Sequence, residues 1–172
     1  MSSEQTSVGV LGGTGPAGTA LAARLASIGY NVVIGSRSSE RAEEKAKEIR
    51  DAWPALNLPL RGGSNEESAA CDIVVLATPW DSAATTVREH AAALRGKVVI
   101  SMANALVRVG HEFQPLVPPR GSVAAHVQAA APDCRVVAAF HHLPAKELGH
   151  LGDPIDSDVL ICSDDKAAIE TV

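Results

Sequence analysis

Three glycines with a fixed spacing are the residues of this chain whose chemistry is easiest to interpret. Gly13, Gly15 and Gly18 form the pattern G-x-G-x-x-G between an apolar run, Val8–Leu11, and a stretch of helical periodicity. In such a setting the first glycine allows a tight turn, the second lets the backbone approach a pyrophosphate, and the third lets the helix pack close to the strand. The pattern predicts a dinucleotide-binding loop, and a turn without a ligand is the alternative.

The residues between these glycines strengthen the expected phosphate site. Thr14 supplies a hydroxyl donor, and Pro16 falls at the first helical position, where its missing N–H is tolerated. Ala17 and Gly18 then provide the nearest free amides, at the positive end of the helix dipole. We therefore expect this segment to hold the pyrophosphate of a dinucleotide.

The end of the second predicted strand indicates which dinucleotide would bind. NAD-binding folds place an acidic residue about 20 residues after the glycines, where it binds the ribose 2′-hydroxyl. Here the strand is followed by Ser36 and Arg37, with Arg41 one helical turn later. Guanidinium groups suit a 2′-phosphate, so the segment predicts NADP. The alternative is that both arginines lie on a solvated surface.

Three later segments are expected to line the same crevice, because ligands of open parallel sheets bind at the carboxyl ends of the strands. These segments are Thr78-Pro79-Trp80, Ser101-Met102-Ala103-Asn104 and Phe140-His141-His142-Leu143-Pro144-Ala145. They contain no catalytic triad or carboxylate pair, but hydride transfer needs mainly positioning and the exclusion of water. Adjacent histidines on an extended loop point apart, so we expect no metal site.

The elements that position these residues alternate along the chain. They predict an α/β fold of the Rossmann type, with a doubly wound, mostly parallel sheet and helices on both faces. The predicted strands are Val8–Leu11, Asn31–Gly35, Leu58–Arg61, Ile73–Ala77, Val98–Ser101, Arg135–Phe140 and Val159–Cys162. The predicted helices are Gly15–Ile28, Ser39–Trp53, a short one from Ser64 to Ala70, Asp81–Leu94 and Ser122–Ala131.

Two segments rich in proline and glycine, Ala103–Arg120 and His141–Asp156, are expected to be functional loops. We expect residues 1–172 to form one NADP-binding domain, because no linker or repeat divides them. A helix start at Ser163–Asp165 leaves only a few turns before the chain ends, so we expect a truncated C-terminus.

The composition limits the kinds of partner that the protein can bind and indicates its cellular compartment. The formal net charge of −5 argues against nucleic acid and anionic membranes, since both need clustered positive charge. The three cysteines lie far apart without a C-x-x-C pattern, which fits reduced thiols. There is no apolar export signal and no apolar run long enough to cross a bilayer. We therefore expect a soluble cytoplasmic protein.

Four motifs together resemble those of one family, the NADPH-dependent coenzyme F420 reductases (F420H2:NADP oxidoreductases). The motifs are Gly12-Gly13-Thr14-Gly15-Pro16-Ala17-Gly18, Ile34-Gly35-Ser36-Arg37, Thr78-Pro79-Trp80 and Phe140-His141-His142-Leu143-Pro144-Ala145. The resemblance extends from Val8 to about Val172. It implies NADP and coenzyme F420 as cofactors and hydride transfer between NADP(H) and the 8-hydroxy-5-deazaflavin ring.

The resemblance also implies roles for individual residues. NADP would be bound by Thr14, Pro16, Ala17, Ser36, Arg37 and Arg41, with Thr78, Pro79 and Trp80 along the path from adenosine to nicotinamide and Ala145 near the nicotinamide. His141 and Leu143 would lie against the deazaflavin ring. The family continues with a further strand and helices that complete the deazaflavin site and a dimer interface. We expect these to be absent here and the full-length form to be a homodimer.

Two other functions stay open at this point. One is a related NADPH:flavin or ferric electron-transfer module, which usually accompanies membrane segments. The other is a non-catalytic fragment that binds or senses NADP. Assays with deazaflavin, flavin and ferric acceptors distinguish these functions.

Overall fold

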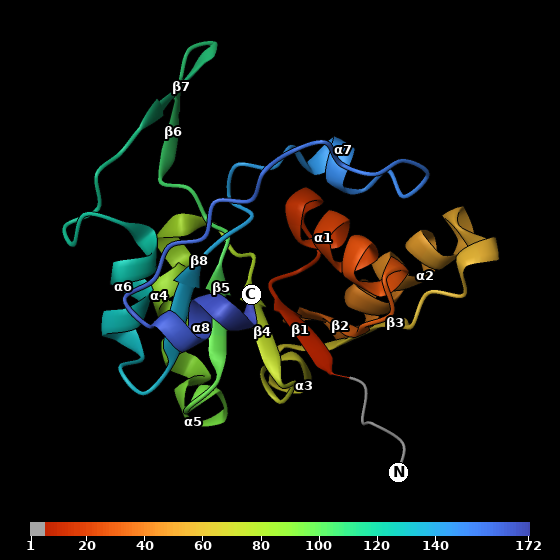
Figure 1. The fold of residues 1–172 in the computed structure, drawn as a ribbon, viewed down its shortest axis with the longest axis horizontal. Coiled ribbons are helices and arrows are strands. Elements are labelled where there is room, and N and C mark those ends of the chain that lie inside the picture. The colour runs from red at the N-terminus through yellow and green to blue at the C-terminus, as the bar shows by residue number, and fades with distance from the viewer. Residues whose placement is uncertain (1–5) are drawn as a thin grey trace.

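A six-stranded sheet forms the centre of the computed structural model, which describes residues 6–172. Its strands are β1 (Ser7–Leu11), β2 (Asn31–Ser36), β3 (Leu60–Ser64), β4 (Ile73–Leu76), β5 (Val98–Ser101) and β8 (Arg135–Ala138). They lie in the order β3-β2-β1-β4-β5-β8, and every neighbouring pair is parallel (Figure 1). The order reverses between β1 and β4, which is the point where such sheets bind ligands. The predicted Rossmann-type fold is confirmed.

Helices cover both faces of the sheet, and each face has its own apolar cluster. One cluster joins the strands to α1 (Pro16–Ser27), α2 (Ser39–Ala52), α7 (Ala145–Leu148) and α8 (Lys166–Thr171). The other joins them to α3 (Asn65–Ala69), α4 (Trp80–Glu89), α5 (Ala91–Leu94) and α6 (Val123–Ala130). Successive side chains of a strand point to opposite faces, so Val74 and Leu76 enter one cluster and Val75 the other. A short 3₁₀ turn, η1 (Pro54–Leu56), precedes β3.

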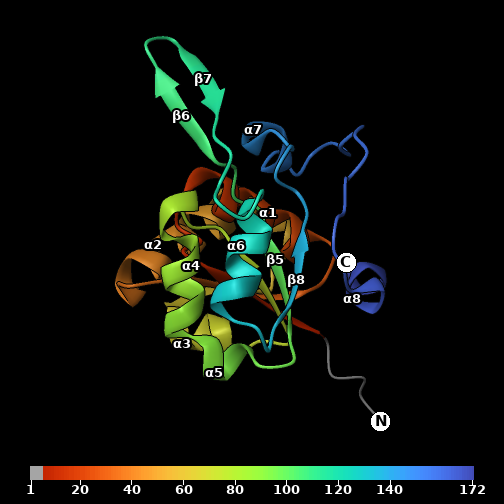
Figure 2. The same ribbon diagram turned by 90° about the vertical axis from the view of Figure 1, so that its left-hand side faces the viewer.

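The expected loop Ala103–Arg120 contains a hairpin that the sequence analysis missed. β6 (Leu106–Val109) and β7 (Glu112–Pro115) pair antiparallel and project from the body of the molecule, as Figures 1 and 2 both show. All eight strand residues are exposed. A hairpin without a buried face has no apolar and polar alternation, which is the pattern that identifies a strand in a sequence.

The predicted strand Val159–Cys162 is wrong. Only Cys162 pairs with the sheet, through a single antiparallel bridge to Ala138. The chain turns away directly afterwards, because the Ser163 hydroxyl donates to the carbonyl of Val136 at 2.7 Å and Asp165 then caps α8. Two other strands have bounds that differ from the predicted ones. The strand β3 begins at Leu60 rather than Leu58, and β8 ends at Ala138, two residues before the predicted end at Phe140.

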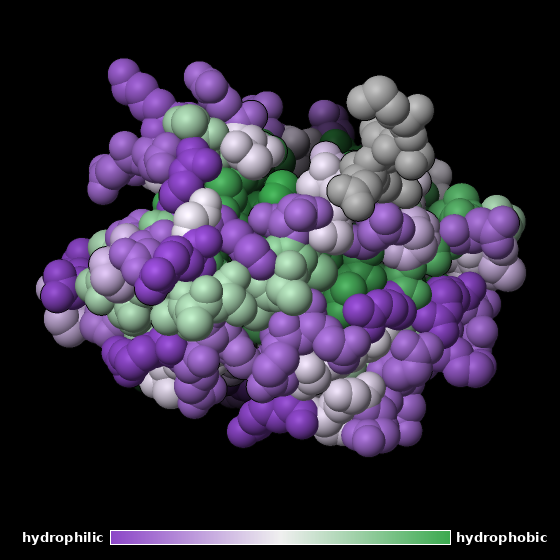
Figure 3. All heavy atoms as spheres, turned by 90° about the horizontal axis from the view of Figure 1, so that it is seen from below, coloured by the Kyte–Doolittle hydropathy of each residue, from purple (hydrophilic) through white to green (hydrophobic). Residues whose placement is uncertain are grey.

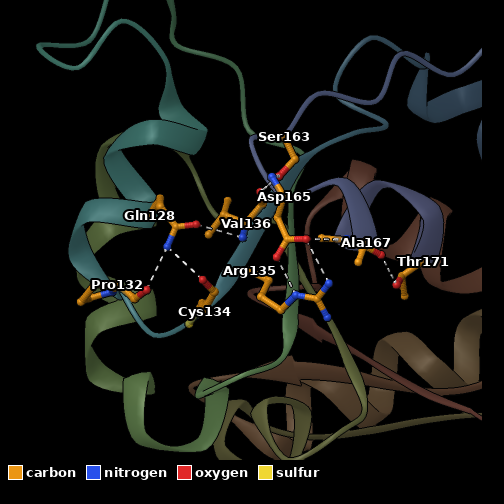
Figure 4. A network of polar contacts seen from close by, with 10 residues as sticks. Gln128, Pro132, Cys134, Arg135, Val136, Ser163, Asp165, Ala167 and Thr171 are labelled. Carbon is orange, nitrogen blue, oxygen red and sulfur yellow. Dashed lines mark hydrogen bonds and ion pairs between the residues drawn. The ribbon is translucent and has the colours of Figure 1, made fainter.

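Beyond the backbone bridge at Cys162, side-chain contacts attach this C-terminal segment. Arg135 forms a two-pronged ion pair with Asp165, with Nε to Oδ2 at 2.7 Å and the second nitrogen to Oδ1 at 3.1 Å (Figure 4). Arg135 and the cap of α8 together hold the pKa of Asp165 at about 2. Gln128 of α6 accepts from the Val136 amide and donates to the Cys134 carbonyl, which fixes α6 to β8. The end of the chain therefore depends on a few polar side chains.

Candidate functional site

A groove of about 680 Å³ opens at the carboxyl ends of the central strands, where the strand order reverses. Ten of the residues predicted to bind a cofactor line it: Thr14, Gly15, Pro16, Ala17, Gly18, Ser36, Arg37, Arg41, Thr78 and Pro79. It is also lined by Gly12, Asn65, Ala77, Ser82, Thr85, Thr86, Glu89 and Met102. The structure thus brings together segments that lie far apart in the sequence.

The glycines of the loop have different local roles. The left-handed turn falls at Gly12, with φ of 65°, rather than at Gly13, where we expected the turn. A side chain on Gly13 or Gly18 would overlap neighbouring atoms at 2.8 Å, so both glycines allow β1 and α1 to pack closely. A Cβ on Gly15 would meet no protein atom within 4 Å. Gly15 is therefore the position where the backbone lies open to the groove.

Pro16 is the first residue of α1, and Gly15 is its N-cap without a side-chain cap. The amides of the first turn of this 12-residue helix therefore lack an intrahelical partner. The residues of this turn line the groove, at the place where a phosphate would bind. This agrees with the expected place of a pyrophosphate.

Two exposed arginines stand at the other end of the groove. Arg37 follows β2, and Arg41 lies in the first turn of α2, whose N-cap Ser38 accepts from the Arg41 amide at 3.2 Å. Neither guanidinium is engaged in the ion pairs found among residues 6–172. Ser36 Oγ accepts from the Ser38 amide at 3.2 Å, which shapes the turn that presents both arginines. This end of the groove can bind an anion.

The sequence analysis missed Asn65, whose carboxamide reaches the glycine loop from α3. Its Oδ1 accepts from the Gly12 amide at 3.3 Å and would lie 3.0 Å from a Cβ at Gly35. The capping box of Ser64 and Glu67 starts α3 at the carboxyl end of β3, which places Asn65 beside the loop. The capping box was visible in the sequence, but the side chain facing the groove was not.

Trp80 and Leu143 lie outside this groove. Trp80 lines a small hollow of about 50 Å³ between α4 and α6 with Pro118 and His126. Leu143 lines an apolar groove on the α1 face with Leu21 and Phe140. Their expected places along the cofactor path and against a deazaflavin ring stay predictions.

His141 lies in a separate cavity of about 290 Å³ beside the carboxyl ends of β5 and β8. Phe140 has φ of 62°, a conformation that bulky residues rarely adopt, and this turn ends β8 just before His141. Asn104 donates to the His141 carbonyl, which ties the loop after β5 to the loop after β8. Burial, and then the neighbouring His142, lowers the pKa of His141. The lowered pKa favours the neutral form of its imidazole.

Ala145 begins α7, which contacts α1 and lies beside it in Figures 1 and 2. Arg24 of α1 holds α7 through its guanidinium, which donates to the carbonyls of Leu148 at 3.1 Å and His150 at 2.6 Å. The sequence analysis gave Arg24 no role, because its partners lie more than 120 residues away.

Residues 6–172 contain no cluster of three or more His, Cys, Asp or Glu side chains suited to a metal ion. Searching the same residues, we find no helix with the length and apolar character needed to cross a membrane.

The parallel sheet, the open glycine loop at a helix N-terminus and the arginines after the second strand define a dinucleotide-binding protein of the Rossmann type. The model of one protein family, described as NADP oxidoreductase coenzyme F420-dependent, matches residues 7–105. This chain belongs to that family.

Related proteins that align with nearly the whole chain agree with this assignment. An F420-dependent NADP reductase of Methanocaldococcus jannaschii is 35% identical over 170 residues, which are 96% of this chain and 76% of the relative. One from Methanothermobacter marburgensis is 33% identical over 171 residues, covering 95% and 75%. A crystal structure of a candidate F420-dependent NADP reductase from Arthrobacter sp. FB24 superposes with a TM-score of 0.75 at 25% identity, covering 97% of this chain and 77% of that one.

Proposed function

We propose that this chain is an oxidoreductase that transfers a hydride between C4 of the NADP(H) nicotinamide and C5 of the 8-hydroxy-5-deazaflavin ring of coenzyme F420. The observation that carries the proposal is the groove in which the glycine loop and the Ser36–Arg41 turn meet. The family assignment and the names of the relatives point to the same pair of cofactors.

The groove offers groups for the 2′-phosphate and for the pyrophosphate of NADP. Arg37 and Arg41 are exposed and unpaired among the described residues, and they bind the 2′-phosphate. The amides of Ala17 and Gly18 receive the pyrophosphate, for which the missing side chain at Gly15 leaves room. Thr78 lines the groove, and its buried hydroxyl has no hydrogen-bond partner among the described residues, so we assign this hydroxyl to the ligand.

The residues beyond Thr78 position the reacting rings rather than supply a nucleophile. NADPH, when bound, supplies two electrons and a proton together as hydride, and the reaction needs aligned rings at near-contact distance without water. Met102 is buried at the end of the groove and bounds this space. His141 and Leu143 border the acceptor, and Ala145 approaches the nicotinamide. A neutral His141 suits a positioning role.

The test is an anaerobic assay in which NADPH is mixed in turn with oxidised F420, FMN and a ferric chelate, and NADP⁺ is mixed with reduced F420. We expect hydride transfer with F420 in both directions and little reaction with the other acceptors. Preference for FMN or ferric iron would replace the proposed function by that of a flavin or ferric reductase. Tight NADPH binding without any turnover would make the chain a binding or sensing module.

The proposal includes a homodimer acting in a reducing cytoplasm. Apolar side chains are exposed on the hairpin, among them Leu106, Val109 and Phe113, and Figure 3 shows further apolar patches among hydrophilic residues at the amino ends of the strands. All three cysteines are free, and burial raises the pKa of the Cys71 and Cys134 thiols. Light scattering of the purified protein tests the dimer.

A further inference from the structure

Three neighbouring strands each lead to a buried polar side-chain atom without a hydrogen-bond partner. These atoms are the Thr78 hydroxyl just after β4, the Ser101 hydroxyl at the end of β5, and Nδ1 of His141 after β8. All three lie at the carboxyl edge of the sheet, where the order is β4-β5-β8. Because buried polar groups are almost always paired, a row of unpaired ones indicates atoms that a ligand completes.

The second and third of these atoms share one cavity. Ser101 and His141 line the space of about 290 Å³ that is closed by the base of the hairpin and the start of α6. Ser101 is 2% exposed, so its hydroxyl cannot find solvent without entering this cavity. The neighbouring residue Met102 lines the cofactor groove and points to the opposite face of the sheet, so the two spaces lie on either side of the carboxyl end of β5.

We propose that Ser101 binds the carboxamide of the nicotinamide, which makes this cavity the terminal subsite of the dinucleotide. The inference rests on the proposed function, because it assumes that NADP occupies the groove. Strands of a sheet lie about 4.8 Å apart, so β5 is about 10 Å from β1 and its glycine loop. A ribose, a pyridine ring and its amide together span about this distance from the pyrophosphate.

The geometry favours the nicotinamide over the acceptor as the partner of Ser101. Hydride transfer requires the acceptor ring to stack on the free face of the nicotinamide, so the acceptor lies farther from the sheet edge. A side chain built into the last residue of a central strand meets the ring that lies against the sheet. A carboxamide has an N–H donor beside a C=O acceptor, and the Ser101 hydroxyl, which can both donate and accept, can pair with either group.

The experiment compares two ligands on three proteins by calorimetry. The ligands are NADP⁺ and adenosine 2′,5′-bisphosphate, which contains the adenosine phosphates but lacks the nicotinamide. The proteins are the wild type, Ser101→Ala, and the control Ser163→Ala, which removes a half-buried hydroxyl that donates to the Val136 carbonyl on β8. Thermal unfolding of each variant reports on damage to the fold.

We expect Ser101→Ala to weaken NADP⁺ binding about threefold to tenfold, the value of one neutral hydrogen bond, and to leave the bisphosphate unchanged. Ser101→Thr, which keeps the hydroxyl, should restore most of the loss. Ser163→Ala should lower the unfolding temperature without changing the ratio of the two affinities.

Unchanged NADP⁺ binding in Ser101→Ala would overturn the inference, as would equal weakening of both ligands. A raised KM for F420 with unchanged NADP⁺ affinity would assign the cavity to the acceptor, and this too contradicts the inference. The affinities for NADP⁺ and the bisphosphate need no turnover, so a wild type that binds NADP⁺ but fails to reduce F420 would remove the proposed function and leave the inference to be judged by its own binding data.

Discussion

The two sides of the crevice are built in different ways. The glycine-loop side, residues 7–41, is held by the backbone: the Gly13 amide donates to the Gly35 carbonyl at 2.9 Å, and Gly18 packs directly on Gly13. The side formed by residues 140–172 is held by side chains from elsewhere, Arg24 on α7 and Arg135 on Asp165. The first side is therefore determined by its own sequence, and the second by partners far along the chain.

This difference has a functional consequence. The glycine-loop side contains the groups that bind phosphates, which need a fixed backbone. The other side contains the residues near the reacting rings, whose positions depend on a few polar contacts. Changes on the first side should affect binding, and changes on the second should affect turnover and local stability.

The largest effect is expected at the centre of the glycine loop. Gly15→Val should abolish NADP binding while the protein stays folded, because the new Cβ meets no protein atom within 4 Å and the side chain fills the space needed by the pyrophosphate. Calorimetry and thermal unfolding measure the two properties. The matched control is Gly18→Val, whose Cβ would lie 2.8 Å from the Gly13 backbone and should cost about 1–3 kcal/mol of stability. Normal NADP binding by Gly15→Val would show that the site is misplaced.

The second effect concerns the attachment of α7. Arg24→Ala removes charged hydrogen bonds to the carbonyls of Leu148 and His150, so α7 should open more often. We expect trypsin to cleave after the exposed Lys146 about tenfold faster or more, as measured by mass spectrometry. The control is Arg88→Ala, an exposed arginine in the last turn of α4. Equal cleavage in both variants would contradict the role of Arg24.

A smaller effect is expected at His141. His141→Ala should lower F420 turnover by less than the 10²–10⁴-fold typical of a lost general acid, because the half-buried imidazole, whose lowered pKa favours the neutral form, positions the rings. The pH profile of the rate should stay unchanged in shape. Near-complete loss of activity, together with the disappearance of an ionisation at or below about pH 6.5, would make His141 a proton donor.

The smallest effect is a pH dependence of stability. Arg135 holds the pKa of Asp165 at about 2, below the unfolded value of about 3.9. A lowered carboxyl pKa stabilises the folded state above about pH 4, and this stabilisation is lost as the pH falls toward 2. Asp165→Asn should therefore reduce the loss of stability between pH 4 and 2, as followed by urea unfolding. An unchanged acid dependence would show that the ion pair does not stabilise the segment.

The same contrast explains how much could be predicted from the sequence. The strands β1, β2, β4 and β5 follow from apolar runs, and ten of the residues that line the cofactor groove follow from the spacing of glycines and from strand ends, which are local signals. The expected turn at Gly13 falls at Gly12, because a sequence pattern does not specify which of two adjacent glycines takes the left-handed conformation.

Features that depend on distant contacts or bury no face were predicted less well, for physical reasons. The hairpin at 106–115 buries no face, and Val159–Cys162 forms one bridge because the Ser163 and Asp165 contacts turn the chain away. The roles of Arg24 and Asn65 depend on contacts more than 50 residues apart in the sequence. Such contacts leave no periodic pattern.

The most direct test of the central claim, that the Ser36–Arg41 turn selects the 2′-phosphate of NADP, is the affinity of the wild type and Arg37→Ala for NADP and NAD. A charge-assisted hydrogen bond contributes about 1.5–3 kcal/mol, so Arg37→Ala should weaken NADP binding about tenfold to a hundredfold and leave NAD binding nearly unchanged. Equal affinities of the wild type for the two nucleotides would contradict the account.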